Sequence, residues 1–219
     1  MSDADFLLWV RGPAFDAATV IFCAGIVVRV VQIYLMGRKA NLAEARGSEM
    51  SGGLGTMFRR TLPDPGAFKR SMFTVITGWV FHIGLFVIIF LFVPHILVFE
   101  KATGLSWSGL PNNIIDATTV ITLITLVAVL IYRLRDPVQR LLSEFGDYLV
   151  WAVTFLPVLT GWLAFNRVGA PPTMLIAVHI LSVELLLVLF PFTKLSHAFT
   201  LWMARWYNGA IAGYRGVKS

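Results

Sequence analysis

The chain contains four histidines, and all of them fall inside long apolar segments, as the pairs His82 with His95 and His179 with His197. An ionisable ring within the hydrocarbon layer of a membrane is costly, so it marks a functional site by default. Neutral imidazole is a common metal ligand and an axial ligand of haem iron. Two histidine pairs on two apolar segments therefore predict two bis-histidine haem sites inside a membrane protein.

The amino-acid composition places the chain in a lipid bilayer. Of its 219 residues, 57% are hydrophobic and 14% are charged, whereas soluble domains are about 45–50% apolar and about 25% charged. A bilayer core about 30 Å thick needs about 20 apolar residues for each helical crossing. We predict a single membrane domain over residues 1–219, an all-α integral membrane bundle of five transmembrane helices at residues 13–36, 72–98, 114–134, 145–166 and 172–203.

The distribution of basic residues predicts the orientation of the bundle. These residues are concentrated in the connection 37–71, in the connection around Asp136 and in the C-terminal tail, which are cytoplasmic by the positive-inside rule. The N-terminus is then outside and the C-terminus cytoplasmic, in the inner membrane of a bacterium or archaeon. Asp3 and Asp5 replace the positive charge of a signal peptide, so the first helix is expected to be retained. The basic residues form no stripe with interleaved aromatics, which argues against nucleic acid as a partner.

The connection 37–71 is the longest polar stretch of the chain. Gly52, Gly53 and Gly55, followed by Pro63 and Pro65, are expected to break any continuous helix there. We expect this connection to lie on the cytoplasmic surface of the membrane. It is either a solvated connector or a docking surface for a soluble partner, and both interpretations stay open.

Depth in the membrane predicts how the four histidines pair. His82 and His197 are both nearer the cytoplasmic face, and His95 and His179 are both nearer the outer face. At 1.5 Å per residue, the 13-residue gap in the second helix spans about 20 Å and the 18-residue gap in the fifth about 27 Å. Eighteen residues make five full turns, so His179 and His197 should project from one face. The rings of His82 and His95 would diverge by about 140° on an ideal helix, unless a kink at Pro94 reorients His95.

Other metal chemistries fit these residues poorly. The ligands of a zinc ion must converge within about 2 Å of the metal, whereas the histidines of one helix lie about 20 Å apart. Cys23 is the only cysteine, so neither the covalent attachment of c-type haem nor an iron–sulfur cluster is available. Any haem must be non-covalent, and onward iron–sulfur centres must belong to a separate partner subunit.

Five further charged residues are candidates for supporting roles. Arg29 and Lys194 are expected either to contact haem propionates or to extend toward the membrane surface. Glu184 is expected to be either a proton relay or a neutral hydrogen-bond donor. Lys101 and Glu100 either border a quinone pocket beside the outer haem or are ordinary solvated loop charges.

Two segments resemble a known family of membrane cytochromes. The fifth apolar segment reads Ala177-Val178-His179-Ile180-Leu181 and later Leu189-Phe190-Pro191-Phe192-Thr193-Lys194-Leu195-Ser196-His197. This resembles the last haem-binding helix of the gamma subunit of respiratory nitrate reductase and its relatives, including the membrane cytochromes of sulfite-reduction-associated complexes and of heterodisulfide reductase. Phe81-His82-Ile83-Gly84 is similar to the second helix of that family, and Arg29 to a basic residue near the end of its first helix. The resemblance extends over most of the chain.

The resemblance implies a function and a set of ligands. In that family, five helices hold two b haems and pass electrons from quinol to an iron–sulfur subunit on the cytoplasmic side. By position, His82 and His197 would bind the inner haem, and His179 would bind the outer haem, for which depth suggests His95 as the second ligand. The nitrate reductase pattern has its second histidine of this helix where this chain has Phe92. The wider spacing is closer to the sulfur-metabolism branch.

Three functions follow as hypotheses. The first is a cytochrome b membrane subunit with two non-covalent b haems, the quinol-oxidising electron-transfer subunit of an oxidoreductase complex, with quinol oxidised near the outer face. The second is a transporter or channel subunit with a histidine-lined path, although the chain has no clear repeat or midplane interruption of the kind transporters use. The third is a structural membrane anchor of an enzyme complex. Haem content discriminates among them.

Overall fold

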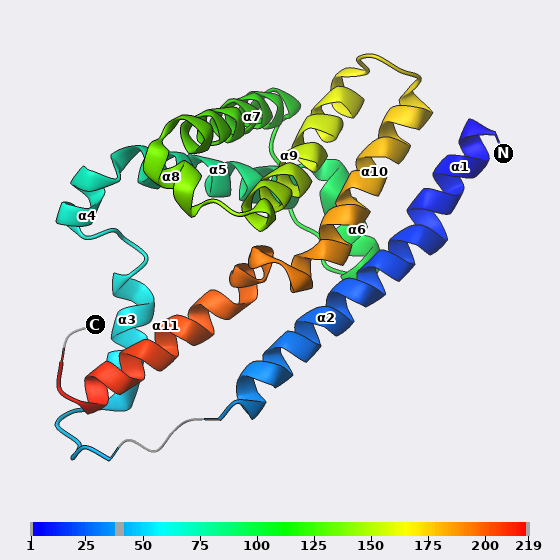
Figure 1. Cartoon of the computed structure of the whole chain (residues 1–219). Helices are drawn as coiled ribbons and strands as arrows, with labels where there is room; N and C mark the ends of the chain where they lie inside the picture. Colours follow the sequence, from blue (N-terminus) through cyan, green and yellow to red (C-terminus); the bar gives the residue numbers. More distant parts are fainter. Residues whose placement is uncertain (1, 38–41, 218–219) are drawn as a thin grey trace. The chain divides into compact units, whose positions relative to one another are not determined.

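The computed structural model describes residues 2–37 and 42–217, and all regular structure within these ranges is helical (Figure 1). Five helices of this part of the chain are long and apolar enough to cross a membrane, at Asp3–Leu35, Met72–Leu91, Asn112–Arg135, Phe145–Asn166 and Pro172–Phe192. The predicted all-helical fold and the five candidate membrane-spanning helices are thereby confirmed, and the fourth span has the predicted boundaries. Residues 38–41 of the predicted connection 37–71 lie outside the described residues.

The chain divides into two compact units. The first comprises Met1–Ala18 and Met72–Leu186, and the second comprises Thr19–Ser71 and Leu187–Ser219. His82, His95 and His179 belong to the first unit, and His197 belongs to the second.

The first span begins ten residues earlier than predicted. It consists of α1 (Asp3–Trp9), the π-helical turn η1 (Val10–Ala14) and α2 (Phe15–Leu35). Ser2 and Asp5 form a capping box, in which the Ser2 hydroxyl accepts from the Asp5 N–H at 3.2 Å. Pro13 lies inside η1 and has no N–H to donate to the preceding turn. The wider π-helical turn accommodates this missing hydrogen bond without ending the helix. The sequence predicted that the helix starts at Pro13, but the structure shows that the helix continues through Pro13 from Asp3.

The second predicted helix, 72–98, is wrong at its C-terminal end. Helix α5 (Met72–Leu91) stops, Phe92 is extended at φ −85° and ψ 122°, and α6 (Val93–Thr103) begins anew. Pro94 occupies the first turn of α6, where the missing N–H costs nothing, but it could not have continued α5. His82 and His95 therefore lie on two different helices, and the divergence of 140° calculated for one ideal helix does not apply.

Close contacts between small residues join α5 to α7 (Asn112–Arg135). A Cβ atom added at Gly84 would collide with the hydroxyl of Thr122, so the two helices approach as closely as glycine allows. Thr119, Thr122 and Thr125 are buried on α7, and each hydroxyl donates to the carbonyl four residues earlier at 2.7 Å. Polar side chains are thus tolerated in this apolar interior because the helix backbone satisfies them.

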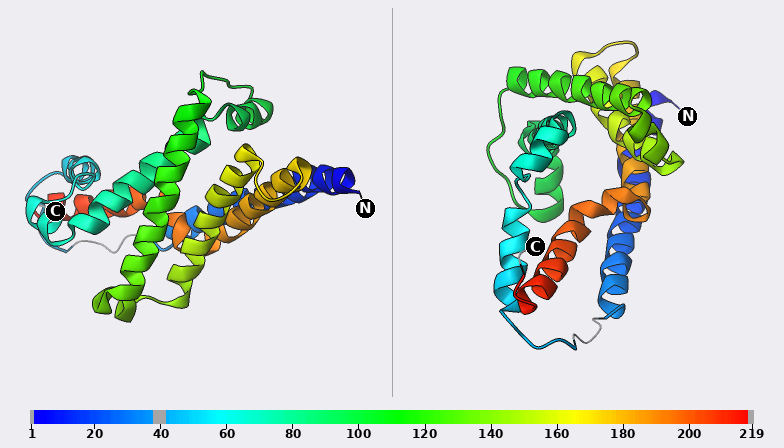
Figure 2. Two further views of the ribbon diagram at one scale, coloured as in Figure 1. Left: turned by 90° about the horizontal axis from the view of Figure 1, so that it is seen from above. Right: turned by 60° about the vertical axis from the view of Figure 1, so that its left-hand side comes forward.

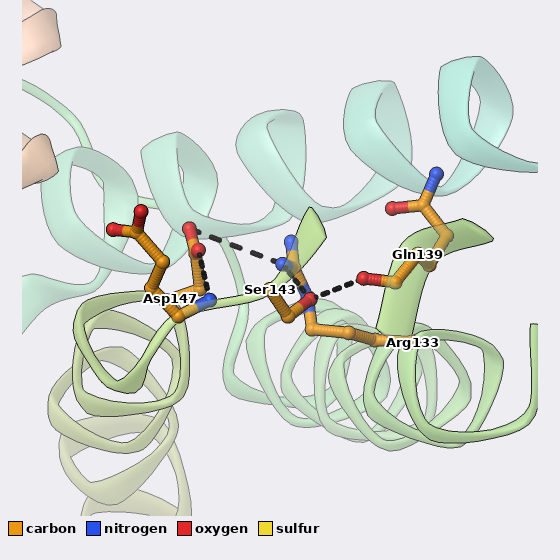
Figure 3. A network of polar contacts seen from close by, with 5 residues as sticks. Arg133, Gln139, Ser143 and Asp147 are labelled. Carbon is orange, nitrogen blue, oxygen red and sulfur yellow. Dashed lines mark hydrogen bonds and ion pairs between the residues drawn. The ribbon is translucent and has the colours of Figure 1, made fainter. Parts of the chain in front are cut away.

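A polar network joins the ends of α7, α8 (Pro137–Leu142) and α9 (Phe145–Asn166), as Figure 3 shows. Arg133 donates to the Ser143 hydroxyl at 2.8 Å and lies 3.9 Å from the Asp147 carboxylate. Ser143 in turn donates to the Gln139 carbonyl at 2.6 Å. The turn between the third and fourth spans is therefore held by the Arg133, Ser143 and Asp147 side chains together with a backbone carbonyl of α8.

The fifth predicted helix, 172–203, is interrupted. Helix α10 (Pro172–Leu189) is followed by two 3₁₀ turns, η2 (Phe190–Phe192) and η3 (Lys194–Ser196), and then by α11 (His197–Tyr214). Pro191 cannot donate to the preceding turn, and Thr193 is extended. The expectation that His179 and His197 share one helix face is therefore wrong, because the five-turn count assumed an unbroken helix.

The connection 37–71 is also more ordered than predicted. It contains α3 (Glu49–Arg59) and α4 (Pro65–Arg70), and α3 runs through Gly52, Gly53 and Gly55, which were expected to break a helix. Helix α3 packs along α11 (Figure 2). A Cβ atom at Gly52 would come within 2.6 Å of the Gly213 Cα, and one at Gly209 within 2.5 Å of the Thr56 Cβ. The glycines are used for close helix approach, and this packing outweighs their low helix propensity.

A pair of alanine substitutions on α3 tests this packing. Gly52→Ala is expected to destabilise the α3–α11 pair by about 1–3 kcal/mol, because the added methyl overpacks a backbone contact. Gly55→Ala is the matched control, since a Cβ there meets only the flexible Arg59 side chain at 3.8 Å or beyond. Limited proteolysis of the 42–71 segment in detergent should accelerate for the first variant and not for the second. Equal protection of both variants would contradict the close approach.

Candidate functional site

The structure brings two of the four histidines together. His95 on α6 and His179 on α10 have ring centroids 6.1 Å apart, and their planes are inclined by 22°. Two imidazoles bound to one metal have ring centres about 6 Å apart, since each metal–nitrogen bond is about 2 Å long and each centre lies about 1 Å behind its nitrogen. The pair therefore has the spacing of two axial ligands of a single iron.

The break between α5 and α6 positions His95. The last carbonyls of a helix have no partner within it, and here three of them receive donors from outside α5. Ile88 O accepts from His95 Nδ1 at 2.9 Å, Phe90 O from Trp107 Nε1 at 2.5 Å, and Leu91 O from the Leu110 N–H at 2.8 Å. The imidazole of His95 is thus one of the donors that satisfy the free carbonyls at the end of α5.

Residues of α9 position His179. Thr160 Oγ1 lies 3.3 Å from His179 Nδ1 and 2.9 Å from Ser182 Oγ. The Thr160 hydroxyl donates to Leu156 O at 2.7 Å, so it is available as an acceptor for the imidazole N–H. A Cβ atom at Gly161 would lie 3.0 Å from the Cε1 atom of His179. The ring is therefore seated against a position where only glycine leaves sufficient space.

All four histidines use Nδ1 in hydrogen bonds to oxygen. His82 Nδ1 lies 2.6 Å from Gly78 O, and His197 Nδ1 lies 2.8 Å from Lys194 O. A carbonyl oxygen can only accept, so in His82, His95 and His197 the Nδ1 atom carries a proton and donates it. Such a bond to the distal nitrogen fixes the ring and is the usual accompaniment of a metal-binding imidazole.

The charge state of His95 also suits a ligand. Helix α6 lies outside the five candidate spans. Burial lowers the pKa of His95 below its ordinary value, because the interior disfavours the charged ring. The imidazole is therefore neutral at pH 7, which is the form that binds metal.

The predicted inner pair is distributed over the two compact units. His82 lies on α5 in the first unit, and His197 is the first residue of α11 in the second. Their pairing remains a prediction from the sequence.

The five charged candidates occupy different environments. Arg29 Nε donates to Pro191 O at 3.1 Å, and so it provides a hydrogen bond to a carbonyl in the interruption between α10 and α11. Lys194 is exposed one turn before His197. Glu100 and Lys101 are exposed in the last turn of α6, and Glu100 accepts from Ser106 Oγ at 3.2 Å. Glu184 is 7% exposed, and within the described part of the chain its Oε1 atom has no hydrogen-bond partner.

Four residues of the site were missed by the sequence reasoning. Trp107, Thr160, Gly161 and Ser182 support the two histidines, yet each is an ordinary residue of a loop or an apolar helix. A local signal existed for Ser182, which lies three residues after His179 and donates to its carbonyl at 2.6 Å. Thr160 and Gly161 lie on another helix, so only tertiary structure relates them to the histidine.

The described residues hold no cluster of three or more histidine, cysteine, aspartate or glutamate side chains that could bind a metal ion. The His95–His179 pair could therefore supply only two protein ligands to a metal. Haem iron requires few ligands from the protein, because the macrocycle provides the equatorial nitrogens and the protein supplies the axial groups. The site fits such a group better than it fits a four-coordinate zinc ion.

Comparison with known proteins gives one informative match. The chain is 29% identical over 203 residues to a sequence of Nitratidesulfovibrio vulgaris strain Hildenborough that is described only as a protein, and the match covers 90% of this chain and 89% of that one. No family model matches the chain.

The hydrogen bond of Trp107 provides a test of how the helix break is held. Trp107→Phe removes the donor to Phe90 O and leaves that carbonyl unsatisfied, which should cost about 1–3 kcal/mol. Trp79→Phe, at an exposed tryptophan of α5, is the matched control. Thermal unfolding in detergent is expected to show a lower midpoint for the first variant only. Identical midpoints would mean that water or lipid replaces the indole without cost.

Proposed function

We propose that the chain is a dihaem cytochrome b membrane subunit that transfers electrons between the quinone pool and an iron–sulfur partner. The single observation that carries this proposal is the His95–His179 pair, with ring centroids 6.1 Å apart. The resemblance of its histidine segments to the nitrate reductase gamma subunit family suggests quinol as the electron donor and an iron–sulfur subunit as the partner. We assign the chain to the branch of that family associated with sulfur metabolism.

The residues of this chain would each perform a defined task in the outer site. His95 and His179 would hold the iron of haem b, which would supply a one-electron redox couple. Ile88 O and Thr160 Oγ1 orient the two imidazoles through Nδ1 and increase the basicity of the ligating nitrogens. Gly161 leaves room for the ring of His179. The protein thereby tunes the cofactor through its ligands and their hydrogen bonds.

The inner site is assigned to His82 and His197. Arg29 is the candidate for a propionate contact at this end, because a guanidinium has five N–H donors and Pro191 O engages only its Nε. Lys194 is the second candidate, one turn before His197. Quinol would be oxidised near the outer face beside Lys101 and Glu100. Glu184 is the candidate proton relay, since it is a buried carboxyl five residues from His179.

The partner and orientation complete the proposal. A single cysteine cannot hold an iron–sulfur cluster, so a cytoplasmic-side partner subunit must carry the next redox centres. The N-terminus is assigned to the outside and the C-terminus to the cytoplasm of a bacterial or archaeal inner membrane. Quinol oxidation would send electrons inward to this partner, and quinone reduction would use the same residues in reverse.

The direct test is haem b per polypeptide in the detergent-purified chain, measured as the pyridine haemochrome. We expect two haems in the unaltered protein and one in the His95→Ala variant, because that substitution removes one axial ligand of the outer site. His82→Ala should likewise leave one haem. In a redox titration, the midpoint potential that disappears should differ from the one lost in His95→Ala. A preparation without haem would contradict the proposal and favour a transporter subunit or structural anchor.

The space beside His179 supports a second test with a matched control. Gly161→Val should push the imidazole from its seat, which we expect to shift the electron paramagnetic resonance signal of one haem or abolish it. Gly146→Val changes the same helix, α9, where an added Cβ meets nothing within 4 Å. An unchanged spectrum in the first variant, with haem retained, would mean that His179 is not an axial ligand.

A further inference from the structure

Helix α3 presents three distinct faces around its axis. The first is packed on α11 through Gly52, Gly53 and Thr56. A second face carries Gly55 and the Arg59 side chain, whose Nε donates to Gly55 O at 3.3 Å. The third is an exposed apolar row made by Met50, Leu54 and Phe58, which are 59%, 45% and 72% exposed. Positions four residues apart lie on one face of a helix, so these three side chains form one continuous stripe about 12 Å long.

Basic residues outnumber acidic ones in the segment that carries this apolar stripe. The described residues 42–71 include five cations against three acidic residues, and all five cations are exposed: Arg46, Arg59, Arg60, Lys69 and Arg70. Arg59 and Arg60 directly follow Phe58 at the C-terminal end of α3. An apolar stripe bordered by arginine and lysine is the combination that binds the boundary between acyl chains and anionic headgroups.

The chain connectivity keeps the α3–α11 pair beside the membrane. The first span ends at Leu35 and the fifth at Phe192, and both are odd-numbered crossings, so they end on the same side. Only four residues, 193–196, separate the end of the fifth span from the start of α11 at His197. Its Trp202 and Tyr207 are 43% and 40% exposed, and both residue types are enriched at the membrane interface.

We propose that α3 is an interfacial helix whose Met50–Leu54–Phe58 stripe inserts into the membrane surface while Arg59 and Arg60 bind the phosphates of anionic phospholipids. The connection 37–71 is then neither a solvated connector nor primarily a protein docking surface. This proposal does not depend on haem binding, because it rests on the second compact unit and on the spans alone.

Spin labelling in vesicles tests the proposal. In a Cys23→Ser background, a nitroxide is attached at position 54, 58 or 55 through Leu54→Cys, Phe58→Cys or Gly55→Cys. Position 55 is about 100° around the helix from Leu54, and a Cβ there meets only the Arg59 side chain. The full-length protein is reconstituted in phosphatidylglycerol–phosphatidylcholine vesicles. We expect the labels at 54 and 58 to collide mainly with oxygen, as in lipid, and the label at 55 to collide mainly with a water-soluble nickel complex.

A charge variant separates lipid binding from simple burial. Arg59→Gln combined with Arg60→Gln should shift the labels at 54 and 58 toward the aqueous reagent, as should vesicles of phosphatidylcholine alone. Water-like accessibility at all three positions in both vesicle types would overturn the proposal and leave a protein partner as the occupant of the stripe. If the labels at 54 and 58 stay lipid-like in the charge variant and in phosphatidylcholine vesicles, the role of anionic headgroups is overturned.

Discussion

The need to satisfy backbone polar groups in an apolar environment governs this structure. Lipid offers no hydrogen bonds, so every interruption of a membrane helix must be matched by donors from the protein. Among the described residues, helices are interrupted in this way after Leu91 and after Leu189. His95 and Trp107 satisfy the first, and Arg29 donates to the carbonyl of Pro191 in the second. Residues chosen for their chemistry in the sequence thus also have a structural role.

This dual role explains why the candidate ligands are well oriented. A histidine whose Nδ1 donates to a carbonyl keeps its proton there and directs the lone pair of Nε2 outward. In His95 that carbonyl exists as an acceptor only because α5 ends, so the helix break and the ligand geometry have one cause. His179 instead depends on packing, through the Thr160 hydroxyl and the space beside Gly161. The two rings then face each other at 6.1 Å.

Glycine illustrates where local reasoning from sequence fails. Gly52 and Gly53 were read as helix breakers, because glycine lowers helix propensity by about 1 kcal/mol. In α3 they form the contact surface for α11, and close backbone packing compensates for that cost. The opposite error concerns Pro94 and Pro191, because the sequence prediction placed both inside long, unbroken helices. Each lies at an interruption, because proline cannot donate to the preceding turn.

The sequence by itself determined the all-helical class and the five candidate membrane spans, and it singled out the histidines proposed as ligands, because hydrophobic runs of about 20 residues and ionisable rings within them are local signals. It also suggested the pairing of His95 with His179 by depth alone. Only the tertiary structure decided that the second and fifth helices break, that a glycine-lined helix covers α11, and that Trp107, Thr160 and Gly161 support the histidines. These features depend on contacts between residues far apart in the chain, which no local pattern encodes.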